Sequence, residues 1–167
     1  CLRCKQRYKM AFDRVQITTI IKETLVAQEL YSDVAVNLLL GTMAVESNFG
    51  TYLYQKPSRI AKGIFQMEIA TERDIWNNYL FYGRAAKRKA IYRISGVRSY
   101  NNNGALEWNI AYGICLVRLF YRRVKEPFPD CDDIEELGKY WKKYYNTFAG
   151  LGTVDDFIYK YNKYVVS

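Results

Sequence analysis

Apolar residues recur along the chain at the three- and four-residue spacing of amphipathic helices, and turn residues fall between these periodic segments. The short, evenly spaced alternation of an all-β protein is not found. The pattern predicts a mainly α protein. We expect helices over residues 14–30, 33–47, from 71 through 80 into the basic segment 84–98, 106–123, 133–145, and from 153 toward 165.

Short polar residues stand where most of these helices should begin, and such side chains accept hydrogen bonds from unpaired backbone N–H groups. The expected capping residues are Asp13, Ser32, Thr71 with Asp74, Asp132 with Glu135, and Thr153 with Asp156. Pro127 and Pro129 should follow the end of a helix because proline lacks the backbone donor. Gly150 and Gly152 should end the next one.

The longest interruption of the helical periodicity covers residues 48–69, which contain Gly50, Pro57, Ser58 and Gly63. These residue types are typical of turns, so we expect a loop with a short extended piece over residues 63–67. The sequence Asn-Asn-Asn-Gly at residues 101–104 predicts a second break.

The chain has 167 residues, half of them hydrophobic, which is enough for one core and too little for two full domains. We therefore expect a single domain over residues 1–167, with residues 1–12 as a flexible or processed extension. The longest apolar stretches fall short of the roughly 20 residues that a membrane helix needs, so no membrane span is expected.

Lys and Arg outnumber Asp and Glu by 25 to 17, and the net charge of +8 favours a polyanion or an anionic surface as partner. The most basic segment, residues 84–98, interleaves its cations with Tyr92 and Ile94. It fits a solvated helix face or a patch for phosphate-type anions. Charge and aromatic content leave a nucleic-acid-binding protein as a further hypothesis, although nucleic acid is not the expected partner.

The cysteines favour neither metal binding nor thiol catalysis. Cys1 and Cys4 form a C-x-x-C pair, with or without a disulfide, while Cys115 and Cys131 stand apart and the chain has no histidine. A zinc site needs a second close pair or histidines, and a Cys-His or Ser-His hydrolase needs a histidine base. We expect no metal and no cofactor, and Cys115 as a buried apolar residue.

Glu46 is the strongest candidate for acid–base chemistry. It follows Met43, Ala44 and Val45 at the end of an apolar helix and precedes a glycine-containing loop. Cleavage of a glycosidic bond needs a carboxylic acid that stays protonated near neutral pH, and apolar surroundings favour that neutral form. The position therefore predicts a general acid.

Four short motifs in order resemble the lytic transglycosylase family of the lysozyme-like superfamily. They are Glu46-Ser47, Gly63-Ile64-Phe65-Gln66-Met67 followed by Thr71, Asn109-Ile110 with Gly113, and Tyr145-Asn146 with Gly150. Together they span about two thirds of the chain. The resemblance implies a lysozyme-like fold with a small loop or short β region near the active-site cleft.

The resemblance also implies an activity, the cleavage of the β-1,4 bond between N-acetylmuramic acid (MurNAc) and N-acetylglucosamine (GlcNAc) in peptidoglycan. Glu46 would protonate the bond and then act as base toward the sugar's own 6-hydroxyl, which is lytic transglycosylation. Ser47 and Tyr145 would orient the carboxyl. The residues implied to hold the acetamido sugar are Gly63, Phe65, Gln66, Met67 and Asn146, with Gly63 allowing a close approach of chain to ligand.

Other interpretations remain open at this point. Glu68 beside the sugar-binding segment would supply the second carboxylate of a hydrolytic lysozyme. The chain could also be a structural virion component with a lysozyme-like fold and little activity. The family resemblance favours a phage-encoded protein in the virion, with tail proteins as partners, or one exposed to the bacterial periplasm and cell wall. Among the tyrosines, Tyr52, Tyr54 and Tyr100 are the first candidates for stacking on sugar rings.

Overall fold

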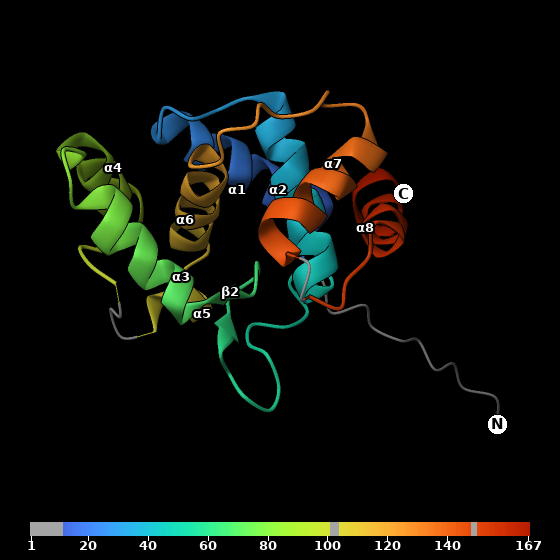
Figure 1. Ribbon diagram of the computed structural model, residues 1–167, viewed down its shortest axis with the longest axis horizontal. Helices are drawn as coiled ribbons and strands as arrows, with labels where there is room; N and C mark the ends of the chain where they lie inside the picture. Colours follow the sequence, from blue (N-terminus) through green and yellow to red (C-terminus); the bar gives the residue numbers. More distant parts are fainter. Residues whose placement is uncertain (1–11, 101–103, 148–149) are drawn as a thin grey trace.

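The computed structural model describes residues 12–100, 104–147 and 150–167 (Figure 1). Helices dominate this part of the chain, so the prediction of a mainly α protein is confirmed. The expected extension over residues 1–12 lies almost wholly outside the described residues, as do Cys1, Cys4 and the three asparagines 101–103. The elements in order are α1 Arg14–Ala27, α2 Asp33–Ser47, β1 Ala61–Lys62, β2 Met67–Glu68, α3 Ile69–Asp74, η1 Ile75–Leu80, α4 Ala85–Ser95, α5 Ala105–Trp108, α6 Ile110–Arg122, α7 Ile134–Trp141, η2 Lys142–Asn146, α8 Val154–Tyr161 and η3 Asn162–Val166, where η marks a π-helical segment.

The first two helices begin at the predicted caps. The Asp13 side chain accepts from the N–H of Gln16, and the Ser32 side chain accepts from the N–H of Ala35. The predicted range of α2 is confirmed, but α1 ends three residues early. Glu29 adopts a left-handed backbone with φ of 59°, and the N–H of Leu30 bonds back to Leu25, which closes the helix.

The loop after α2 carries a two-stranded hairpin. β1 and β2 pair antiparallel, with Ala61 opposite Glu68 and Lys62 opposite Met67. The expected extended piece over residues 63–67 is therefore misplaced, because residues 63–66 form the turn and only residue 67 belongs to a strand. Gly63 and Gln66 both have positive φ, 74° and 47°, which an extended strand does not allow.

The helix predicted from Thr71 into the basic segment is wrong in two respects. α3 already begins at Ile69, and Glu68 stands at its N-cap position without a side-chain capping bond. The helical path then breaks after η1 at Gly83, which has φ of 67°, before α4 begins. Thr71 therefore lies inside α3, where no cap is needed.

The helix predicted over residues 106–123 is two helices. Asn109 separates α5 from α6 with an extended backbone, and its side chain accepts from the N–H of Tyr112 while donating to the carbonyl of Ser95. Asn109 is thus the N-cap of α6. This helix ends before Pro127, as predicted.

The last helices follow the expected order with one shifted cap. Asp133, rather than Asp132, accepts from the N–H of Glu136 at the start of α7. At the start of α8, Thr153 and Asp156 cap each other's backbone N–H groups as predicted.

The helix α2 forms the centre of the core. Figure 1 shows it between α6 on one side and α7 and α8 on the other, and it packs against all three. Gly41 of α2 allows the close approach of α8, because a Cβ at this position would lie 2.1 Å from the Phe157 ring. No described helix combines the length and the hydropathy that crossing a bilayer requires.

Candidate active site

A cavity of about 850 Å³ opens between the C-terminal end of α2, the hairpin, η2 and the first turns of α8. Six of the nine candidate catalytic and sugar-binding residues line it, although they come from three separate segments: Glu46, Gln66, Met67, Glu68, Tyr145 and Asn146. Ser47, Gly63 and Phe65 are buried and do not line it. The fold therefore brings most of the predicted site together.

The carboxyl of Glu46 lies largely buried in the cavity wall. Its Oε1 accepts a hydrogen bond of 3.0 Å from the indole N–H of Trp141, the last residue of α7. Burial raises the pKa of Glu46 from its ordinary value near 4.5 to about 7, although the Trp141 hydrogen bond and the charge of Lys160 oppose this shift. The group is thus poised to hold or release a proton near neutral pH.

Lys160 of α8 also lines the cavity. Its ammonium donates to the carbonyl oxygen of Val45 at 3.1 Å, so it is fixed one residue from Glu46. Its positive charge favours the ionised carboxylate and lowers the pKa of Glu46. The pKa of Glu46 is therefore the balance of burial, which raises it, and of the Lys160 charge and the Trp141 N–H, which lower it.

Tyr145 faces the cavity and lies close to both carboxylates. Burial raises the pKa of its hydroxyl well above the ordinary value, and the charges of Glu46 and Glu68 add to this effect. Its hydroxyl donates to the carbonyl oxygen of Phe65 at 2.9 Å. The expected hydrogen bond from Tyr145 to Glu46 is therefore replaced by a bond that fastens η2 to the hairpin.

Ser47 does not orient the Glu46 carboxyl as expected. Its hydroxyl is fully buried, donates to the carbonyl oxygen of Ile64 at 2.6 Å and accepts from the N–H of Gly50 at 2.8 Å. Adjacent residues of a helix point in different directions, so Ser47 faces the hairpin while Glu46 faces the cavity. Ser47 therefore ties the end of α2 to the hairpin.

The hairpin turn also differs from the expectation. A Cβ on Gly63 would lie 2.2 Å from the carbonyl oxygen of Leu106, so the close approach that this glycine permits is to α5 and not to a ligand. Gln66 and Met67 line the cavity. The amide of Gln66 donates to the carbonyl oxygen of Gly63 at 2.7 Å, which leaves its oxygen available to a ligand N–H.

Asn146, at the end of η2, also lines the cavity. Lys142 donates to the Asn146 side-chain oxygen and to the carbonyl oxygen of Gly150, both at 2.8 Å. A side chain on Gly150 would collide with Asn146, at 2.3 Å from its carbonyl oxygen. Lys142 thus fixes the end of η2 against the segment that leads into α8.

Glu68 lines the same cavity as Glu46 but is exposed to solvent. Tyr52, Tyr54 and Tyr100 do not line it. Two of these rings lie under guanidinium groups instead, with Arg59 4.1 Å from the centroid of Tyr54 and Arg73 5.8 Å from that of Tyr100. The aromatic residues of the cavity are Phe120, Trp141, Tyr144 and Tyr145.

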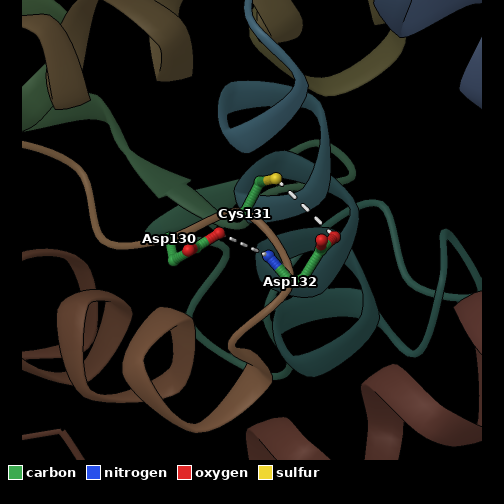
Figure 2. Close-up of side chains that lie close together, drawn as sticks. All are labelled: Asp130, Cys131 and Asp132. Atoms are coloured by element: carbon green, nitrogen blue, oxygen red, sulfur yellow. Dashed lines mark hydrogen bonds between the residues drawn. The ribbon is translucent and has the colours of Figure 1, made fainter.

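Asp130, Cys131 and Asp132 bring three possible metal ligands within 4.8 Å of one another (Figure 2). Their contacts are internal, since the Asp132 N–H bonds to Asp130 and the Cys131 thiol to Asp132. Burial and the two neighbouring carboxylates raise the pKa of the Cys131 thiol. The expectation that the chain binds no metal stays a prediction.

Cys115 is fully buried in α6, as the sequence predicted. Burial raises the pKa of its thiol to about 12, so the thiol stays neutral and unreactive.

Two residues that act on Glu46 are not identified by the sequence interpretation. The sequence alone assigns no chemical role to Trp141 or to Lys160. Trp141 lies 95 positions from Glu46, and neither residue belongs to a motif that the resemblance covers. A buried indole needs an acceptor for its N–H, which is the one sequence-level signal that points to a polar partner for Trp141.

Comparisons of the chain with protein-family models, curated proteins and solved structures find no match.

Proposed function

We propose that the chain is a peptidoglycan-cleaving enzyme of lysozyme-like fold that breaks the β-1,4 bond between MurNAc and GlcNAc with Glu46 as its acid and base. The observation that carries the proposal is a largely buried carboxyl with a pKa near 7 on the wall of a cavity of about 850 Å³. A volume of this size lies within the range of small-molecule sites. The motif resemblance supplies the substrate class.

The chemistry follows from the protonation state of Glu46. In its neutral form the carboxyl donates its proton to the glycosidic oxygen, and the bond from that oxygen to C1 of MurNAc breaks. The resulting carboxylate then takes the proton from the 6-hydroxyl of the same MurNAc, whose oxygen bonds to C1 and closes an anhydro ring. Trp141 and Lys160 stabilise the carboxylate between the two steps, because each favours the charged form.

The remaining lining residues support recognition of an acetamido sugar. Gln66 and Asn146 both line the cavity, and their amide groups offer hydrogen bonds of the kind that fix a sugar's N-acetyl group. Phe120, Tyr144 and Tyr145 supply aromatic surface for the ring faces.

Hydrolysis is the second candidate, and one observation favours it: Glu68 lines the same cavity as Glu46. A second carboxylate can activate water or stabilise the sugar cation. Mass spectrometry of the muropeptides separates the two reactions, because transglycosylation leaves an anhydro terminus and hydrolysis leaves a reducing one. A reducing product that depends on Glu68 would establish the hydrolytic version.

The decisive test is clearing of purified peptidoglycan by the Glu46→Gln variant. We expect at least about a 100-fold loss of activity with the fold retained, since a positioned acid contributes a factor of this order. The matched control is Glu68→Gln, a carboxylate of the same cavity that transglycosylation does not require. Full activity of Glu46→Gln contradicts the assignment of the acid, and an inactive wild-type chain on several wall chemistries favours the structural virion component instead.

A further inference from the structure

The turn between η1 and α4 presents two neighbouring aromatic side chains to solvent. Phe81 is 68% exposed and Tyr82 is 67% exposed, and their rings meet edge to face with centroids 5.3 Å apart. Gly83, the next residue, has no atom within 4 Å of where its Cβ would stand, so the turn projects from the surface. Single exposed aromatic side chains are common on protein surfaces, but two in mutual contact form an apolar patch of the kind found at interaction sites.

The turn is held in a fixed shape by two arginines. Arg84 donates to the carbonyl oxygens of Tyr79 and Tyr82, and Arg88 donates to those of Leu80 and Phe81. The guanidinium of Arg84 also lies 4.1 Å from the centre of the Tyr79 ring. These bonds satisfy the last carbonyls of η1 and hold Phe81 and Tyr82 in their outward position.

The surroundings of this pair are strongly basic. Between Asp74 and Glu107 the sequence has no acidic residue and six cations: Arg84, Lys87, Arg88, Lys89, Arg93 and Arg98. In these hydrogen bonds the four arginines donate to uncharged carbonyl or hydroxyl oxygens, and these acceptors do not neutralise their positive charge. Two of these cations border the aromatic pair directly, because Arg84 donates to the carbonyl oxygen of Tyr82 and Arg88 to that of Phe81.

This corner lies away from the catalytic cavity. Figure 1 shows α4 at one end of the longest axis of the molecule and α8, which lines the cavity, at the other. A surface bound at the η1–α4 corner therefore leaves the cavity open.

We propose that the η1–α4 corner, formed by Phe81, Tyr82, Arg84 and Arg88, docks the protein onto the surface of an anionic lipid bilayer. The two rings enter the interface between headgroups and acyl chains, where aromatic side chains are favoured. The cations attract the negative headgroups, each contributing at short range. The protein lies on the membrane and does not span it.

The aromatic pair favours a bilayer over a soluble polyanion. A polyphosphate chain or a nucleic acid binds cations, and its affinity depends on the number of neutralised phosphates. A polyphosphate or a nucleic-acid duplex gains little from a phenyl ring held outward at a turn, because neither presents unstacked bases. At a bilayer interface the rings bury apolar surface and the cations attract anionic headgroups. This corner combines both kinds of side chain.

The test is co-sedimentation of the full chain with vesicles of phosphatidylcholine containing phosphatidylglycerol, compared with phosphatidylcholine alone. We expect binding only to the anionic vesicles. The double variant Phe81→Ser/Tyr82→Ser should bind at least about tenfold more weakly, equivalent to roughly 1.4 kcal/mol. The matched control is Tyr159→Ser on α8, a tyrosine that is 64% exposed and should leave binding unchanged.

Two further readouts make the outcome decisive. A Phe81→Trp variant should lose fluorescence when the vesicles carry brominated acyl chains, which shows that the ring enters the bilayer, and the wild type gives the background.

Absence of binding to anionic vesicles, or binding that the double variant retains in full, overturns the proposal. Equal affinity for DNA and vesicles in both proteins would instead assign the corner to polyanions. Activity on soluble glycan fragments should be unchanged in the double variant, so this test is independent of the catalytic assignment.

Discussion

Replacing Glu46 by glutamine should make the protein more stable at neutral pH while removing the proposed activity. The carboxyl is desolvated in the folded protein, and burial raises its pKa from about 4.5 to about 7. Folding therefore favours the protonated form of Glu46. Glutamine resembles that neutral form in shape, and its side-chain oxygen still accepts the hydrogen bond from Trp141.

The magnitude follows from the difference between the folded and unfolded pKa values. One pKa unit corresponds to about 1.4 kcal/mol, so the ionised Glu46 costs the folded state about 3 kcal/mol at and above neutral pH. Below about pH 4.5 the group is protonated in both states and this cost disappears. The stability of the wild type should thus fall between about pH 4.5 and pH 7 relative to the variant, and then level off.

The assay is urea unfolding of both proteins at a series of pH values, with equal m-values as the check on two-state behaviour. All other titrating groups are shared, so the difference in unfolding free energy isolates residue 46. The control Glu68→Gln changes an exposed carboxylate and should alter stability by less than about 0.5 kcal/mol. A difference between wild type and Glu46→Gln that stays constant from about pH 4 to pH 8 would refute the argument.

Three further predictions test the surroundings of this group. Trp141→Phe removes an N–H that favours the carboxylate, so the pKa of Glu46 should rise and the alkaline limb of the pH–activity profile should move to higher pH; an unmoved limb counts against the bond. Ser47→Ala should lower the unfolding free energy by about 1–3 kcal/mol, measured by urea unfolding, because two buried backbone groups lose their partner, while the same alkaline limb stays in place. Gly63→Ala should destabilise the fold by more than Gly83→Ala in thermal unfolding, where about 1 kcal/mol is expected for the left-handed backbone alone, because only position 63 also meets a carbonyl oxygen at 2.2 Å. Equal losses would contradict the steric clash expected at position 63.

The sequence predicted the helices best where a short polar side chain stands directly before an apolar period. Asp13, Ser32 and Thr153 all cap the helices they were expected to cap. The pattern failed at Asp132 because the neighbouring Asp133 carries the same side chain, and only the backbone conformation selects between them. It placed the end of α1 too late because Glu29 adopts the left-handed conformation that ends the helix. Glycine usually occupies such a position, so the sequence carries no signal for the end there.

The candidate site was predictable only in part. The apolar residues before Glu46 indicated a buried carboxyl, and the structure places it in a cavity wall. The partners of that carboxyl depend on how α7 and α8 pack against α2, which spacing along the chain does not encode. The family resemblance implied that Ser47 orients the Glu46 carboxyl, but adjacent residues of a helix point in different directions, and the Ser47 hydroxyl donates to the carbonyl oxygen of Ile64 instead.

The contact of Gly41 with Phe157 has a consequence for how the acidity of Glu46 can vary. It sets the distance between α2 and α8, and α8 carries Lys160, whose charge opposes the effect of burial on Glu46. A methyl group at position 41 would push α8 outward, weaken that charge effect and make Glu46 a weaker acid. Substitutions at positions 41 and 157 can therefore change the pKa of Glu46 without changing any residue that lines the cavity.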